Sequence, residues 1–313
     1  MTSRTTPVVV CIDIEPDDRQ VDASAPEWLG VEATSTIIER WRESLDEATG
    51  HAARFSWFWR ADPQIADAYG SAAWGFQHYH DVYTHTSSKG DAHGIHSHSW
   101  RRLPTNEWVQ DRADARWVET CVEMSLTTFR EVTGRRCRIT RLGDRALDSV
   151  AYRCLARHGV RVDLSVEPGE GPFELEATAP SPDFASAPTW PYRPRRHDVT
   201  RPRRLARGPV LLPLSATVGE GPEGGGTRLR TVYPWLPSAP ALAAQLLDQA
   251  SPYLAFAVRS DIGIRPELSV HFEALLGALA EHPRATSLRF VTPLEAVDAL
   301  RRVRAARSTT VSA

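Results

Sequence analysis

The sequence has little lysine, few cysteines and no long apolar run. Lys89 is the one lysine among 37 basic residues, a bias that a GC-rich genome produces through its arginine codons. The four cysteines, Cys11, Cys121, Cys137 and Cys154, show no C-x-x-C spacing. Zinc ribbons and thioredoxin-like redox motifs are therefore excluded, and we expect four buried free thiols.

Several classes of protein have no support in this sequence. No segment approaches the ~18 consecutive apolar residues of a membrane-spanning helix, and the short run at Val8 is no signal-peptide core. A formal net charge of −2 gives no general attraction for nucleic acid or anionic membranes. No dinucleotide-binding or P-loop motif follows the first apolar run. We expect a cytoplasmic protein with reduced cysteines, no membrane span and no nucleic-acid partner.

Short β-rich runs alternate with longer helical patterns along almost the whole chain. The runs predict strands at 8–14, 55–59, 94–98, 138–141, 160–165, 209–214, 253–258 and 288–291. The patterns predict helices at 34–48, 107–132, 147–157, 239–249, 266–281 and 294–303. Long loops are expected at 167–208 and 217–232, where proline, arginine and glycine accumulate.

This alternation predicts mostly parallel strands joined by right-handed crossovers, hence an α/β protein. Seven or eight such units in 313 residues fit an irregular (β/α)7–8 barrel better than two domains. We expect one domain over 8–305, between a flexible N-terminus at 1–7 and a flexible tail at 306–313.

Two groups of polar residues follow predicted strands. Asp13 and Glu15 end the first strand, and His96 and His98 end the third. In a parallel barrel the carboxyl ends of the strands carry the functional site. Carboxylates and imidazoles there can hold a divalent metal, and they can also supply a general base. The pattern predicts a metal-assisted hydrolase.

In chain order, these strings resemble the motifs of the NodB-like polysaccharide deacetylases, over residues 8 to 303. Cys11-Ile12-Asp13-Ile14-Glu15 occupies the place of the family's first motif, and it is similar to a branch that reads V-D-V-E. The resemblance implies that Asp13 is the general base. Ile14 stands where the family has a metal-binding aspartate, so Glu15 or Asp17 would take over as the acidic ligand.

The second family motif, H-[ST]-x-x-H, is matched at His96 and Ser97. Trp100 stands at the second ligand position, and His98 is the replacement that the spacing suggests. The resemblance therefore implies one divalent metal, Zn²⁺ by family analogy, held by Glu15, His96 and His98.

The remaining motifs imply further site residues. Arg141 resembles the arginine that orients the catalytic aspartate, and Asp163 matches the strand motif D-x-S. The fifth motif supplies a histidine acid in the family, but here Arg259 and Asp261 follow the strand instead. Residues expected to bind substrate are Arg60, Asp62, Trp100, Arg259 and Asp261.

The function that the resemblance implies is removal of an acyl group from an N-acylated sugar or a similar small amide. One alternative is a catalytically silent or metal-free protein of the same fold that binds a carbohydrate or a protein. A second alternative is a glycosidase, which needs two carboxylates that flank the bond, such as Asp13 with Asp163 or Asp261. Trp190 is a candidate platform for a sugar ring, whereas Trp59 is expected in the core.

Overall fold

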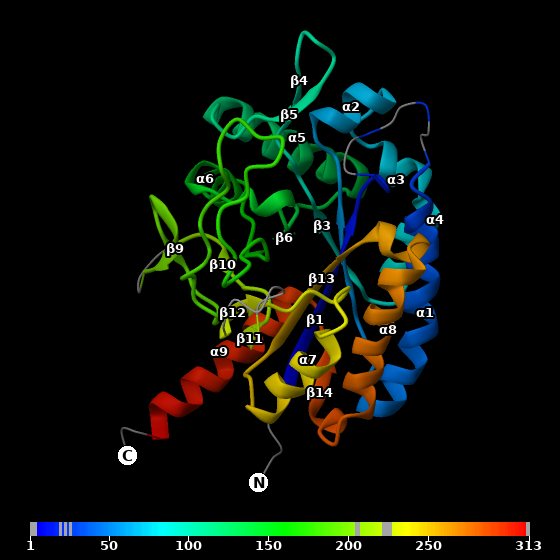
Figure 1. Ribbon diagram of the computed structural model, residues 1–313, viewed down its shortest axis with the longest axis vertical. Coiled ribbons are helices and arrows are strands. Elements are labelled where there is room, and N and C mark those ends of the chain that lie inside the picture. The colour runs from blue at the N-terminus through cyan, green and yellow to red at the C-terminus, as the bar shows by residue number, and fades with distance from the viewer. Residues whose placement is uncertain are drawn as a thin grey trace.

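The computed structural model describes residues 5–18, 21, 24, 27–203, 207–220 and 227–310. An eight-stranded sheet with all pairings parallel curls into a barrel at its centre (Figure 1). The strands in spatial order are β10 (Val210–Leu211), β7 (Val162–Asp163), β6 (Ile139–Thr140), β3 (Ala92–Ile95), β2 (Ser56–Trp59), β1 (Thr6–Ile14) and β13 (Leu254–Arg259), with β14 (Leu288–Phe290) also on β1. The predicted α/β barrel is confirmed.

Helices join these strands and cover the outside of the sheet (Figure 1). The α-helices are α1 (Leu29–Thr49), α2 (Pro63–Tyr69), α3 (Trp74–His78), α4 (His80–Ser88), α5 (Ala115–Thr133), α6 (Ser149–Arg157), α7 (Ala239–Asp248), α8 (Pro266–Glu281) and α9 (Pro293–Thr310). Short 3-10 helices span Gly143–Arg145, Ser260–Ile264 and Ala285–Ser287.

Both predicted long loops contain hairpins. The segment 167–208 carries β8 (Pro194–Arg195) and β9 (Asp198–Pro202), and the segment 217–232 lies mostly in β11 (Ala216–Glu220) and β12 (Thr227–Thr231). The glycine-rich residues 221–226 lie outside the described residues, as do 1–4 and 311–313 of the two predicted flexible ends. A third hairpin pairs β4 (Trp100–Arg102) with β5 (Trp108–Gln110).

Three predicted helix boundaries are wrong, and the first is that of the helix expected from 34, which begins at Leu29. The helix expected from 107 begins at Ala115, because Asp114 caps it by accepting hydrogen bonds from the backbone N–H groups of Arg116 and Trp117. Residues 108–110 before it pair as β5. The last helix, α9, continues to Thr310, past the point at 305 where a tail was expected.

The site is positioned by the alternation of side chains along each strand. On β1, Val8, Val10 and Ile12 pack against the helices, whereas Val9 and Cys11 belong to a separate apolar cluster inside the barrel. Since successive side chains on a strand point to opposite faces, Asp13 continues the inner row at the carboxyl end. The same alternation on β13 places Arg259 above Ala255 and Ala257, and the register pairs Asp13 with Arg259.

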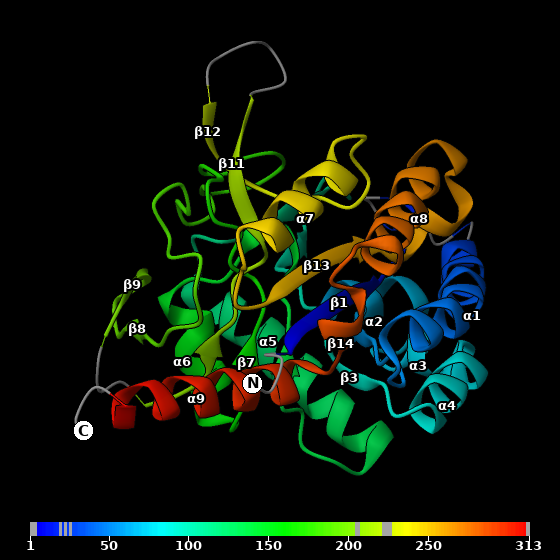
Figure 2. The ribbon, with the colours of Figure 1, turned by 90° about the horizontal axis from the view of Figure 1, so that it is seen from below.

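The barrel is closed between β10 and β13 and filled below the site. The Ser215 backbone N–H donates to the Ala255 carbonyl at 2.8 Å, so residues 212–215 bridge the two edges. The inner cluster includes Val162 of β7, Leu212 directly after β10 and Tyr253 directly before β13, together with Ala296 and Val297 from α9. Figure 2 shows α9 running across this lower end of the barrel.

The four cysteines are buried and free, as expected. Trp59 is fully buried, as predicted, and its ring stacks on Phe76, whereas Trp190 is exposed. Among the described residues, no helix is long and apolar enough to cross a membrane.

Candidate functional site

A cavity of about 210 Å³ lies at the carboxyl ends of the strands. Charged groups of both signs and three aromatic rings line it: Asp13, Glu15, His96, His98, Arg141, Asp144, Arg145, Glu167, Phe173, Tyr233, Trp235, Ala257, Val258 and Arg259. All three predicted metal ligands are in this lining, and so are Asp13, Arg141 and Arg259.

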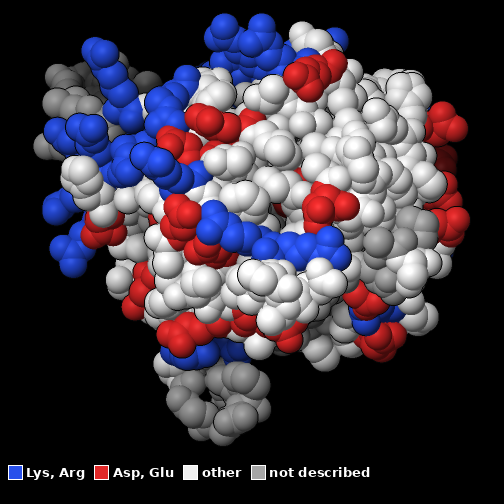
Figure 3. Space-filling model, turned by 90° about the horizontal axis from the view of Figure 1, so that it is seen from above, with Lys and Arg blue, Asp and Glu red and all other residues white. Residues whose placement is uncertain are grey.

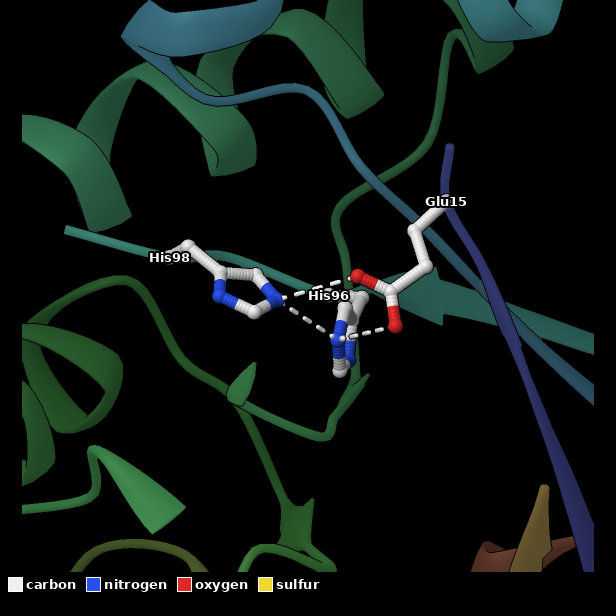
Figure 4. Close-up of side chains that lie close together, drawn as sticks. All are labelled: Glu15, His96 and His98. Atoms are coloured by element: carbon white, nitrogen blue, oxygen red, sulfur yellow. Dashed lines mark hydrogen bonds and ion pairs between the residues drawn. The ribbon is translucent and has the colours of Figure 1, made fainter. Parts of the chain in front are cut away.

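Glu15, His96 and His98 converge on one point (Figure 4). The Nε2 atoms of the two histidines lie 3.0 Å apart, and carboxylate oxygens of Glu15 lie 3.2 Å from His98 Nε2 and 3.7 Å from His96 Nε2. All three side chains are buried. The donor atoms of three buried side chains therefore face one another at the wall of the cavity.

The two histidines reach this point because the chain bends after β3. The strand was expected to run from 94 to 98, but it ends at Ile95. The backbone N–H of His96 still bonds to the Trp59 carbonyl, whereas that of His98 bonds to Asp62 Oδ2 at 3.0 Å. This bend brings two imidazoles that are two residues apart to a common point.

The other nitrogen of each imidazole lies close to an oxygen atom. His96 Nδ1 lies 2.8 Å from the Arg141 carbonyl oxygen, so Nδ1 is the donor and Nε2 keeps its lone pair. His98 Nδ1 lies 3.1 Å from Asp144 Oδ2. Burial lowers the pKa of His96. Burial and Arg60 also oppose the charged form of His98, but the Asp144 and Glu15 carboxylates outweigh them and raise its pKa.

Asp144 and Gly143 are adapted to this role. The backbone of Asp144 has φ 48° and ψ 36°, which lie in the left-handed region that residues other than glycine rarely adopt. It also accepts a hydrogen bond from Gln110. A Cβ on Gly143 would lie 2.0 Å from His98 Nε2, so the imidazole occupies the space that any other residue there would need.

Asp13 belongs to a chain of buried charges. Arg141 Nε donates to Asp13 Oδ2 at 2.9 Å, and Arg141 Nη2 donates to Glu167 Oε1 at 3.0 Å. The Tyr233 hydroxyl donates to Glu167 Oε2 at 2.8 Å. Asp13 Oδ1 is buried without a hydrogen-bond partner and lies 3.5 Å from His96 Nδ1. One oxygen of Asp13 is thus fixed, and the other is available on the histidine side.

Glu15 is surrounded by cations. Arg259 Nε lies 2.8 Å from Glu15 Oε1, and Arg60 Nη1 lies 3.8 Å from Glu15 Oε2. Burial alone would raise the pKa of Glu15, but Arg259 and the two histidines outweigh it and hold that pKa well below its usual range. Glu15 is therefore an ionised carboxylate at neutral pH. Asp17, the other predicted ligand, instead accepts hydrogen bonds from the N–H groups of Leu29 and Gly30 at the start of α1.

Four residues expected to bind substrate lie outside the cavity lining. Arg60 forms a buried two-point ion pair with Asp62, and Asp62 also holds the His98 backbone. Trp100 is fully buried, and Asp261 pairs with Arg265 at 2.8 Å. These four side chains therefore lie next to the site residues and not in the cavity. Of the five residues predicted to bind substrate, only Arg259 lines the cavity.

Asp163, expected to be catalytic, also lies outside the lining. Its carboxyl group is fully buried and accepts hydrogen bonds from the hydroxyls of Thr140 and Ser165 and from the Ser165 backbone. Burial raises the pKa of Asp163 to about 6. This geometry ties β6 to β7 beneath Arg141.

We expect Asp163→Asn to change the pH dependence of stability. Because the pKa is raised to about 6 in the folded protein, the stability that Asp163 contributes is present below pH 4 and is lost as the pH rises through 6. The asparagine is neutral throughout. The difference in the free energy of unfolding, variant minus wild type, should therefore be roughly 2 kcal/mol more positive at pH 7 than at pH 4. Urea unfolding at the two pH values measures this difference. Equal shifts at the two pH values would contradict this.

Several residues that line the cavity were not predicted from the sequence as site residues. Asp144 and Glu167 stood in strings that resembled family motifs but carried no assigned role, and Arg145 stood in no such string. Phe173, Tyr233 and Trp235 come from the segments around the two long loops. An acidic residue directly after Arg141-Leu142-Gly143 was the signal that could have pointed to Asp144.

The comparisons with known proteins concern the fold. No protein-family model matches the sequence, and no curated protein matches it. Among solved structures, a proposed glycoside hydrolase/deacetylase from Parabacteroides distasonis aligns with a TM-score of 0.63 at 16% identity, over 96% of this chain and 72% of the other. A proposed polysaccharide deacetylase from Mycobacterium smegmatis aligns with a TM-score of 0.52 at 13% identity, over 96% and 92%. The chain has the NodB-like deacetylase fold.

The residues present fit a divalent metal. A tetrahedral zinc ion with ligands about 2.0–2.1 Å away separates neighbouring ligand atoms by about 3.3 Å. Here the two histidine Nε2 atoms lie 3.0 Å apart, Glu15 Oε2 lies 3.2 Å from His98 Nε2, and Glu15 Oε1 lies 3.7 Å from His96 Nε2, which is close to that spacing. A lone pair on His96 Nε2, an ionised Glu15 and outer partners on both imidazoles complete the donor set that such an ion requires.

Proposed function

We propose that this protein is a metal-dependent hydrolase of the deacetylase type, which removes an acyl group from an N-acylated sugar or a similar small amide. The observation that carries the proposal is the convergence of Glu15, His96 and His98 beside the buried Asp13–Arg141 pair. The cavity is small, about 210 Å³, which suits an acyl group and one ring rather than an extended chain.

The proposed roles follow from the contacts. Glu15, His96 and His98 would hold the ion, Zn²⁺ by analogy, and a bound ion would supply Lewis acidity and lower the pKa of water. Asp13 would accept the proton of the attacking water at Oδ1, the oxygen that makes no other hydrogen bond. Arg141 would keep Asp13 ionised and oriented through Oδ2.

The proton for the leaving amine needs a donor other than the family's histidine. The Tyr233 hydroxyl lines the cavity and is hydrogen-bonded to Glu167, which makes this pair the candidate. The glycosidase alternative is not favoured, because both carboxylates considered as partners of Asp13 lie outside the cavity lining.

The first experiment separates this proposal from the metal-free binding alternative. Protein purified without chelator is analysed for metals, and amine release is followed with N-acetylglucosamine and its short oligomers. About one equivalent of metal together with turnover would support the proposal. Absence of both, after reconstitution with Zn²⁺, would favour a binding protein.

We expect Asp13→Asn to lower kcat by about 10²–10⁴-fold, the range that a general base contributes. The asparagine fills the same space but cannot take the proton. Metal content should change little, since Asp13 is not one of the converging ligands, whereas the melting temperature should fall because Arg141 loses the charge of a buried partner. Loss of metal from this variant would move Asp13 into the ligand set instead.

A further inference from the structure

The β8–β9 hairpin and its flanks concentrate positive charge. Between residues 193 and 207 the sequence has arginines at 193, 195, 196, 201, 203, 204 and 207, and Asp198 is the one acidic residue. Arg195, Arg196 and Arg203 are exposed and make no ion pair with an acidic side chain among the described residues. With a formal net charge of −2 for the whole chain, this segment is a local excess and exceeds what a codon bias predicts.

Helix α9 extends the basic region. Arg301 and Arg302 are exposed. Burial and the nearby Arg301 cation lower the pKa of Arg193, so positive charges of the two elements repel each other. Figure 3 shows Lys and Arg gathered along the left side of the molecule, the side on which β9 lies in Figure 1.

An apolar groove adjoins these arginines. It has a volume of about 560 Å³, and its lining includes the apolar side chains of Ala187, Pro188, Trp190, Pro202 and Leu229, together with Arg201 and three hydroxyl-bearing residues. Trp190 is 55% exposed. Arg201 borders the groove and pairs with Asp198 at 3.2 Å. Apolar and cationic groups therefore share one exposed surface.

We propose that this basic surface (Arg195, Arg196, Arg201, Arg203 and Trp190) docks the protein on an anionic phospholipid membrane. Arginines attract the phosphates of acidic lipids, and an exposed tryptophan beside them settles at the interface between headgroups and acyl chains. The lining favours lipid over nucleic acid, because Ala187, Pro188, Pro202 and Leu229 beside the exposed Trp190 offer an apolar surface on which acyl chains can pack.

The test is co-sedimentation of the full chain with vesicles. We expect binding to vesicles of phosphatidylcholine with phosphatidylglycerol, little binding to phosphatidylcholine alone, and a fall in binding with salt. The triple variant Arg195→Gln/Arg196→Gln/Arg203→Gln should bind on the order of a hundredfold more weakly. Trp190→Ala should weaken binding at high salt, where the apolar contribution remains.

A matched control removes the same charge elsewhere. Arg116, Arg135 and Arg136 are also exposed, and their replacement by glutamine should leave vesicle binding within about threefold. Equal losses in the two triple variants would overturn the proposal, as would equal binding to both vesicle types. Binding of an RNA or duplex DNA oligonucleotide without vesicle binding would also overturn it. The assay needs no catalytic turnover, so its outcome is independent of the proposed hydrolase activity.

Discussion

His96→Ala is expected to remove both bound metal and hydrolysis. The imidazole supplies one of three converging ligand atoms, and its Nδ1 contact with the Arg141 carbonyl keeps Nε2 free for an ion. Loss of an outer partner alone costs about 10–100-fold in metal affinity. Loss of the ligand itself should therefore weaken Zn²⁺ binding by more than about a hundredfold. Elemental analysis and competition with a zinc-binding dye measure this directly.

His85→Ala is the matched control, because His85 is a half-exposed histidine on α4 that pairs with Glu39. It should keep its metal and its turnover. Stoichiometric Zn²⁺ retained in His96→Ala would end the assignment of the metal site, whatever the activity. Loss of metal in both variants would point to a general loss of folding, which circular dichroism detects.

Gly143→Ala is expected to dismantle the site by displacing His98. The new methyl group would lie 2.0 Å from His98 Nε2, and no side-chain rotation of alanine can relieve that contact. Either the imidazole leaves its position or the 143–145 turn moves, and with it the Asp144 contact to His98. We expect a loss of about 1–3 kcal/mol in the free energy of unfolding, the range for an overpacked core.

Zinc affinity of Gly143→Ala should fall as far as it does in His98→Ala, which leaves Gly143 intact. Gly171→Ala is the control, since a Cβ on Gly171 would have no atom within 4 Å. It should match the wild type in both stability and metal content. Wild-type zinc affinity in Gly143→Ala would show that His98 is not a required ligand.

The sequence predicted the barrel because its signal is repeated. The continuous apolar run before Asp13 and the alternation of strands with helices are read at several places along the chain, so an error at one boundary leaves the fold unchanged. The same logic placed Asp13, Glu15, His96 and His98 at strand ends. Their convergence depended on the end of β3 at Ile95 and on the Asp62 contact to the His98 backbone, neither of which a local pattern encodes.

Other site residues could not be predicted, since their roles arise from contacts between distant segments. Glu167 meets Arg141 and Tyr233 only after β6, β7 and the β11–β12 hairpin assemble. Asp163 matched a motif, yet hydrogen bonds to Thr140 and Ser165 hold it outside the cavity lining. Asp62 and Trp100 were predicted to contact substrate, and the structure places them outside the cavity lining, with Asp62 hydrogen-bonded to the His98 backbone.

The packed interior of the barrel below the cavity limits the routes by which substrate can enter and products can leave. Apolar side chains of the inner cluster, together with Ala296 and Val297 of α9, occupy the space beneath the cavity. No substrate or product can pass through the barrel, so a molecule that enters at the carboxyl ends of the strands must also leave there. In the proposed reaction the carboxylic acid and the amine would share one exit, and acetate that remains in the cavity would occupy the place of the substrate's acyl group, so added acetate should raise the apparent KM.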